Sequence, residues 1–114
     1  MKTKEEVIKK LYTFLDLKDN WDSYGAVPPN IKYVNQARDF ITEYPRIPWF
    51  VAPGVNGEIL VVYLSDDERY ECELYFDEDP QLLISDENYS VTEEEFFPYD
   101  GEIDPFILNK YLSK

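Results

Sequence analysis

Residues 55–76 read VNGEILVVYLSDDERYECELYF, and this stretch decides the fold. Asn56-Gly57 is a dipeptide that strongly favours a two-residue hairpin turn. The run Ile59–Leu64 is apolar throughout, as expected of a central strand that is covered on both faces. After a polar turn, buried and solvent-facing residue types alternate through Tyr70–Phe76, which is typical of a half-buried strand. The stretch therefore predicts two adjacent antiparallel strands.

The same period of two predicts one further strand on either side of this pair. Trp49–Ala52 has the pattern of a short first strand. Gln81–Ile84 has the pattern of a fourth strand, after a turn at Asp77-Glu78-Asp79-Pro80. We therefore expect an antiparallel meander of about four strands.

Two amphipathic helices are expected before the sheet. Thr3-Lys4-Glu5-Glu6 has the pattern of a capping box, and apolar residues then recur at helical spacing to about Leu17. Asn30 can cap a second helix to about Glu43, before Pro45 ends it. The residues expected to face the core are Val7, Ile8, Leu11, Phe14 and Leu15 in the first helix, and Ile31, Val34, Ala37, Phe40 and Ile41 in the second.

Short helices are also expected after the sheet. Thr92-Glu93-Glu94-Glu95 has the pattern of a second capping box, which would open a helical turn at Phe96-Phe97. Asp104-Pro105 would begin a final helix, with Phe106, Ile107, Tyr111 and Leu112 on its apolar face. The fold class is thus predicted to be α+β, as a single domain over residues 1–114 with two N-terminal helices packed on the sheet.

Residue types that are missing exclude several kinds of chemistry. The chain has no His and one cysteine, Cys72, so Cys–His pairs, Ser–His–Asp triads, His-ligated zinc and an intramolecular disulfide are excluded. We expect Cys72 to be a small buried apolar residue. The N-terminal MKTKEEVIKK lacks the apolar stretch of a signal peptide, and no apolar run approaches roughly 18 residues. We therefore expect a cytoplasmic protein that does not bind membranes.

The most distinctive segment is NWDSYGAVPP, at residues 20–29. We interpret it as a rigid structural corner between the two helices. Trp21 is expected to be largely buried in the gap between the first helix and the sheet, while Asn20 and Asp22 bond to loose backbone groups. Gly25 suits a backbone position with positive φ. The alternative, that this corner, with Tyr24 in it, is a binding site, stays open.

The corner resembles the Asn-Trp-Asp-Gly-Tyr-Gly-Ala…Pro signature of a family of small, largely uncharacterised bacterial and mobile-element proteins. The likeness extends to the helix that follows, the proline-rich step and the strand start at Gly57-Glu58-Ile59, and covers roughly residues 10–85. This chain has Ser23 where the signature usually has Gly. The family has no established activity, so the resemblance implies a fold and no mechanism.

Charge is distributed unevenly along the chain. Residues 1–57 hold 8 Lys+Arg and 7 Asp+Glu, whereas residues 58–114 hold 3 and 17, and the net charge is −13. Thirteen carboxylates and no basic residue lie between Glu71 and Asp104. Such a field repels nucleic acid and anionic membranes and attracts cationic surfaces. An alternative is that the acidic residues only keep the protein soluble.

The acidic and aromatic stretch from Glu71 to Asp104 is the best candidate for a working surface, because carboxylates steer a cationic partner and aromatic rings anchor it. The candidate partner-binding residues are Glu71, Glu73, Tyr75, Asp77, Glu78, Asp79, Asp86, Glu87, Glu93, Glu94, Phe97 and Tyr99. We expect a non-enzymatic module that inhibits or regulates a basic protein, by analogy with immunity proteins, antitoxins and phage anti-defence proteins. Carboxylates spaced like DNA phosphates would be a special case.

Enzymatic alternatives have little support in the sequence. Asp100-Gly101-Glu102-Ile103-Asp104 offers oxygen ligands but lacks the spacing of an EF-hand loop, and the chain has no glycine-rich phosphate loop. A carboxylate-metal nuclease would repel its own substrate through the negative field. No cofactor and no metal site is expected, and a carboxylate-metal enzyme stays the enzymatic alternative.

Overall fold

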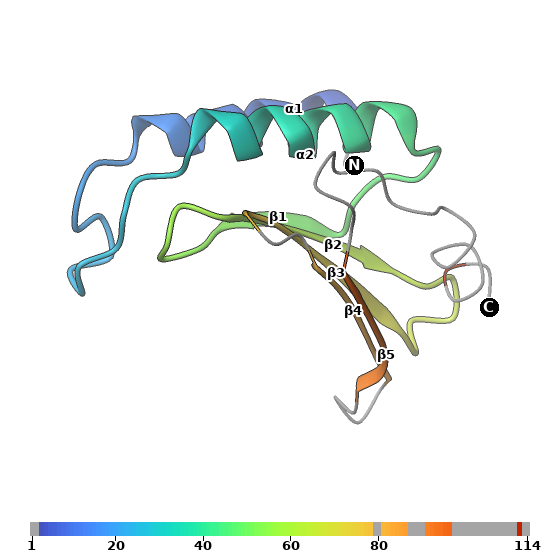
Figure 1. Cartoon of the computed structure of the whole chain (residues 1–114). Coiled ribbons are helices and arrows are strands. Elements are labelled where there is room, and N and C mark those ends of the chain that lie inside the picture. The colour runs from blue at the N-terminus through green and yellow to red at the C-terminus, as the bar shows by residue number, and fades with distance from the viewer. Residues whose placement is uncertain (1–2, 79–80, 87–90, 97–111, 113–114) are drawn as a thin grey trace.

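The computed structural model describes residues 3–78, 81–86, 91–96 and 112. Two helices and a short 3-10 helix precede five strands, whose bounds are α1 (Lys4–Thr13), η1 (Phe14–Asp16), α2 (Ile31–Glu43), β1 (Phe50–Pro53), β2 (Ile59–Leu64), β3 (Glu71–Phe76), β4 (Gln81–Ser85) and β5 (Val91–Phe96). The strands form one antiparallel sheet in the order β1-β2-β3-β4-β5. Both helices lie on the same side of this sheet (Figure 1), which confirms the α+β class.

Both helices begin at the expected caps. The Thr3 hydroxyl accepts a hydrogen bond from the Glu6 backbone N–H at 3.1 Å, and the Asn30 side chain accepts one from the Lys32 N–H at 2.9 Å. The first helix is shorter than predicted, because the α-helix ends at Thr13 and the 3-10 turn η1 continues the apolar face to Asp16. The second helix ends at Glu43, as predicted.

The core lies between the helices and one face of the sheet. On this face the ladder brings Val51, Val61, Leu74 and Leu82 into one row across four strands, because each is the register partner of the next. The row is almost fully buried. The residues that the helices and η1 bury in the same cluster are Val7, Leu11, Phe14, Tyr33, Val34, Ala37 and Ile41.

One residue expected on the buried face of α2 is exposed instead. Ile31 keeps 52% of its surface accessible. The first turn of α2 is tied to the β1–β2 turn, since the Asn30 N–H donates to the Gly57 carbonyl at 3.1 Å. Ile31 is therefore held beside the β1–β2 turn, at the end of the sheet.

The fifth strand corrects the expectation for Thr92-Glu93-Glu94-Glu95. These residues belong to β5 and do not cap a helical turn. In the register, Glu94 stands opposite Leu83 and Glu93 opposite Ile84. The free edge of β4 offers hydrogen-bond partners to every second residue of the segment, whereas a single helical turn is costly to nucleate, so the ladder overrides the local capping pattern.

Most of the expected C-terminal helices lie outside the described residues. This includes the turn at Phe97 and the residues Asp104-Pro105, Phe106, Ile107 and Tyr111. Leu112 is described, and it is helical and fully buried in the core cluster. Its carbonyl accepts a hydrogen bond from the Asp66 N–H at 3.0 Å, which ties it to the β2–β3 turn.

A buried hydroxyl gives a test of this core. The Tyr63 ring is 1% exposed and packs edge-on against Tyr44, and its hydroxyl has no hydrogen-bond partner within the described part of the chain. An unsatisfied buried polar group costs about 1–3 kcal/mol. Tyr63→Phe keeps the ring and removes the hydroxyl, so we expect urea denaturation to show the free energy of unfolding raised by about 1 kcal/mol.

Tyr12→Phe is the matched control. The Tyr12 hydroxyl donates to Asn35 at 3.0 Å and accepts from Arg38 at 2.7 Å, so its removal should destabilise the protein. A loss of stability in Tyr63→Phe as large as that in Tyr12→Phe would contradict this description of the core.

Candidate protein-binding surface

The face of the sheet turned away from the helices combines apolar side chains with carboxylates. We call it the open face, because no described element covers it (Figure 1). Val62, at its centre, is 1% exposed, and the remaining residues are half-buried. The open face consists of Phe50, Ala52, Leu60, Val62, Leu64, Glu71, Glu73, Tyr75, Gln81, Leu83 and Ser85.

Three of the predicted partner-binding residues lie together on this face. Glu71, Glu73 and Tyr75 occupy alternate positions of β3, opposite Leu64, Val62 and Leu60 of β2. The Tyr75 hydroxyl donates a hydrogen bond to the Glu73 carboxylate at 2.7 Å. Burial, and then the bond to the negative Glu73, raise the pKa of Tyr75 above its usual value. The ring and the carboxylate are thereby held as one unit.

Basic side chains are concentrated in the helical layer, where carboxylates such as Glu5, Glu6 and Asp39 accompany them. From Phe50 to Asp86 the sequence has a single basic residue, Arg69, which lies in the β2–β3 turn and not on a strand. The helical layer, by contrast, carries Lys4, Lys9, Lys10, Lys32 and Arg38. The Lys4 ammonium bonds to the carbonyl of Tyr44 at the end of α2, and so uses its charge within that layer. The open face therefore presents carboxylates among apolar groups, with no cation of its own in β1–β4.

The corner is held by its own side chains. The Asp22 carboxylate accepts from the N–H groups of Tyr24 and Ala26, at 2.8 and 3.0 Å, and the Asn20 side chain accepts from Gly25 at 2.6 Å. Gly25 has a φ of +86°, as predicted. The Trp21 indole N–H donates to the Val27 carbonyl at 3.0 Å. These bonds agree with the interpretation of a rigid corner.

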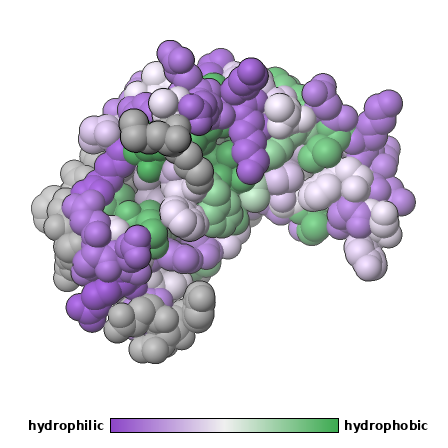
Figure 2. Space-filling view, turned by 180° about the vertical axis from the view of Figure 1, so that it is seen from behind, coloured by the Kyte–Doolittle hydropathy of each residue, from purple (hydrophilic) through white to green (hydrophobic). Residues whose placement is uncertain are grey.

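One feature of the corner differs from the expectation. Trp21 is half-buried and not largely buried, because the corner projects past the end of the sheet (Figure 1) and the indole N–H bonds to Val27 of the same loop. Tyr24 is 92% exposed at the tip. Figure 2 shows the corner as a projection with hydrophobic side chains beside it. Ser23, which replaces the Gly of the signature, adopts a φ of +68°.

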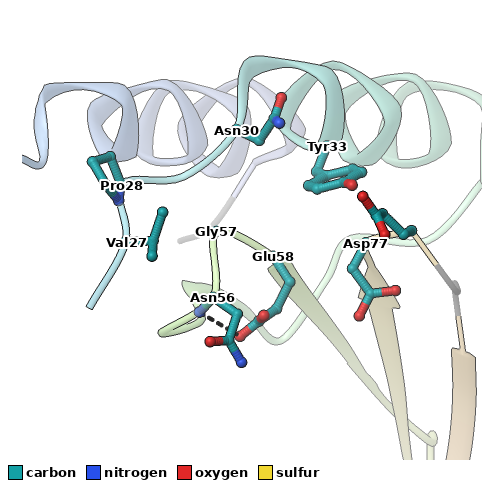
Figure 3. A pocket seen from close by; sticks show the side chains of 9 residues that line it. Val27, Pro28, Asn30, Tyr33, Asn56, Gly57, Glu58 and Asp77 are labelled. Atoms are coloured by element: carbon teal, nitrogen blue, oxygen red, sulfur yellow. Dashed lines mark hydrogen bonds between the residues drawn. The ribbon is translucent and has the colours of Figure 1, made fainter. Parts of the chain in front are cut away.

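A pocket of about 470 Å³ lies where the corner, α2 and the end of the sheet meet (Figure 3). Asn30 and Tyr33 of the second helix stand above it, the corner forms one side, and the β1–β2 turn closes it from below. The end of β3 adds two of the predicted residues, Asp77 and Glu78. The complete lining is Val27, Pro28, Asn30, Tyr33, Asn56, Gly57, Glu58, Asp77 and Glu78.

The other predicted partner-binding residues are more scattered. Asp86 is half-buried just after β4. Glu93 and Glu94 occupy successive positions of β5, so they belong to opposite faces of the sheet. The register places Glu94 opposite Leu83, in the row of the open face. Asp79, Glu87, Phe97 and Tyr99 lie outside the described residues. The sequence did not predict that Glu58, Asn30 and Tyr33 line a pocket. The hairpin signal at Asn56-Gly57 was the one hint, because these two residues also belong to the lining.

The described residues offer little for catalysis. Cys72 is fully buried, as predicted, and burial raises the pKa of its thiol to about 12, which disfavours the nucleophilic thiolate. Within the described ranges, no group of three Asp, Glu or Cys side chains is placed to hold a metal ion. None of the helices in these ranges has the length and apolar character needed to cross a membrane.

Comparison with protein-family models, curated proteins and solved structures gives no match to this chain. The likeness of the corner to the Asn-Trp-Asp signature therefore stays a prediction.

The backbone of Ser23 gives a test of the corner. A non-glycine residue at positive φ is strained, and glycine removes this strain while adding entropy to the unfolded chain. We expect Ser23→Gly to be more stable than Ser23→Ala by about 0.5 kcal/mol, measured as the shift of the thermal midpoint. Ser23→Ala also removes the hydroxyl but keeps the Cβ atom. If the alanine variant were the more stable of the two, the corner geometry described above would be wrong.

Proposed function

We propose that the protein is a non-enzymatic, acidic protein-binding module that inhibits or regulates a basic protein, such as one that acts on nucleic acid. Immunity, antitoxin or phage anti-defence proteins are the functional class that this surface fits by analogy. The single observation that supports the proposal most is the open face, where Glu71, Glu73 and Tyr75 lie among Leu60, Val62 and Leu83, and where strands β1–β4 contribute no basic side chain.

The physical case depends on the mixture of groups. Surface carboxylates accelerate the approach of a cationic partner, and the acceleration falls as salt screens them over about 8–10 Å. Apolar and aromatic groups next to them supply the contact area that slows dissociation. Carboxylates that served only solubility would need no apolar neighbours, whereas here the apolar groups of the open face alternate with them.

The location of the carboxylates gives a test. The probe is the peptide acetyl-(Leu-Arg)4-amide, which offers both cations and apolar groups, and stopped-flow fluorescence gives its association rate. Glu71→Gln with Glu73→Gln should slow association several-fold at about 0.01 M ionic strength and much less at about 0.15 M. Tyr75→Ala should instead speed dissociation.

A matched control removes the same charge from the helical layer. Glu5 and Glu6 are exposed on α1, so Glu5→Gln with Glu6→Gln removes the same two negative charges as the open-face pair does. This control should change the association rate less than the open-face pair. Equal effects from the two pairs would show that only the total charge attracts the peptide, and the proposal for the open face would fail.

A further inference from the structure

The pocket beside the corner is lined by carboxylates on one part of its wall and by apolar side chains on another. Glu58 directly precedes β2, and Asp77 and Glu78 directly follow β3, so three carboxylates lie at one end of the sheet. Val27 and Pro28 of the corner supply apolar surface, and Tyr33 supplies a ring that is 8% exposed. Its volume of about 470 Å³ is within the roughly 300–1,000 Å³ typical of binding clefts.

The backbone fixes the walls of this pocket. The Val27 N–H donates to the Val55 carbonyl at 2.8 Å, and the Asn30 N–H donates to the Gly57 carbonyl at 3.1 Å, so the corner is bonded to the β1–β2 turn on both sides of its prolines. Gly57 has a φ of +84°, and a Cβ atom there would lie 3.2 Å from the Pro28 carbonyl oxygen. The pocket thus exists before any ligand arrives, which lowers the entropic cost of binding.

Glu58 is positioned by a neighbouring glycine. Its carboxylate occupies the space that a Cβ atom on Gly54 would fill. It also accepts a long hydrogen bond from the Asn56 N–H, at 3.5 Å (Figure 3). A backbone hydrogen bond also joins the two sides of the β1–β2 turn here, since the Gly54 N–H donates to the Glu58 carbonyl at 2.9 Å.

The donor set favours an organic cation over a metal ion. The carboxylates of the described residues are not gathered closely enough to coordinate one ion. A planar guanidinium can bond to carboxylates that are spread along a wall, because its five N–H donors form a fork. Its aliphatic stem suits the apolar surface of Val27 and Pro28.

An apolar rim adjoins the pocket. Val27, which lines the pocket, is 49% exposed and Val55 is 51% exposed, although both belong to a hydrogen-bonded part of the fold. Val27 and Val55 are neighbours through their backbone bond. Exposed apolar residues on a preorganised loop make good anchors, because little conformational freedom is lost when they are covered.

We infer that this pocket receives an arginine side chain of the basic partner, while the rim of Val27 and Val55 packs against an apolar residue next to that arginine. This inference rests on the proposed function and specifies the partner for one end of the surface. It gives the corner a binding role in addition to its structural one. The inference selects arginine over lysine, since the guanidinium fork matches carboxylates that are spread along a wall.

Small probes test the pocket directly. The probes are N-acetyl-arginine amide, N-acetyl-lysine amide and the neutral isostere N-acetyl-citrulline amide, titrated against the whole chain and followed by the amide shifts of Tyr33, Asn56 and Gly57. We expect weak, saturable binding of the arginine amide at these amides. Citrulline should bind about tenfold more weakly, as loss of a charged hydrogen bond predicts, and lysine should fall between them.

Two variants and a control locate the binding. Glu58→Gln with Asp77→Asn should weaken the arginine amide about tenfold. Gly54→Ala keeps every charge but displaces the Glu58 carboxylate, and should weaken it several-fold. Glu5→Gln with Glu43→Gln, on exposed helical positions, should leave the affinity unchanged.

The contradicting outcomes separate this inference from the proposed function. If arginine and citrulline amides bind alike, or if Gly54→Ala has no effect, the pocket does not receive arginine. If the shifts spread over carboxylates across the whole molecule, the attraction is diffuse and the inference also fails. A spermidine control that bound more tightly than the arginine amide would point to a small-molecule site instead. In each case the comparison of the Glu71 and Glu73 pair with the Glu5 and Glu6 pair would still test the open face, because none of these residues lines the pocket.

Rim variants complete the test with the longer peptide. Val55→Ala should speed dissociation of acetyl-(Leu-Arg)4-amide and change thermal stability little, because the side chain is 51% exposed. Ile47→Ala is the control, since Ile47 is a 47% exposed apolar residue between α2 and β1 and does not line the pocket. If Ile47→Ala speeds dissociation as much as Val55→Ala does, the rim has no specific role.

Discussion

The structure depends on one constraint, which is that the two helices and η1 cover a single face of a five-stranded sheet. Burial of the row from Val51 to Leu82 against α1 and α2 supplies the hydrophobic core. The opposite face then has to be tolerable in water, and alternate positions of β3 meet this need with Glu71 and Glu73. The same alternation that stabilises the fold therefore places carboxylates beside the apolar residues of the open face, which is the combination that the proposed function requires.

Much of the fold could be predicted because its signals are local. The side chains of Thr3 and Asn30, each ahead of a run of apolar residues at helical spacing, predicted where both helices begin. Asn56-Gly57 predicted the hairpin between β1 and β2. β5 could not be predicted in the same way. Thr92–Glu95 satisfies a local capping pattern, and only the free edge of β4, assembled from residues far along the chain, makes the strand preferable.

In the candidate site, too, local patterns could be predicted and long-range contacts could not. The alternation in β3 was enough to predict that Glu71, Glu73 and Tyr75 share a face. The pocket was not predictable, because it joins residues 27–33, 56–58 and 77–78, whose contact depends on how the corner closes against the β1–β2 turn. The hydrogen bonds within the corner agree with a rigid segment. The residue type of Trp21 suggests a core position, whereas the loop that carries Trp21 lies past the end of the sheet and leaves it half-buried.

The central claim is that a basic protein docks on the sheet side of the molecule. The most direct measurement is zero-length carbodiimide cross-linking of the chain to the basic protein that it retains from the cells in which it is expressed, followed by peptide mass spectrometry. We predict that partner lysines become joined to Glu71 and Glu73 of the open face, since an arginine held in the pocket forms no such cross-link. Cross-links concentrated instead on Glu5, Glu6, Asp39 and Glu43 of the helical layer would contradict it.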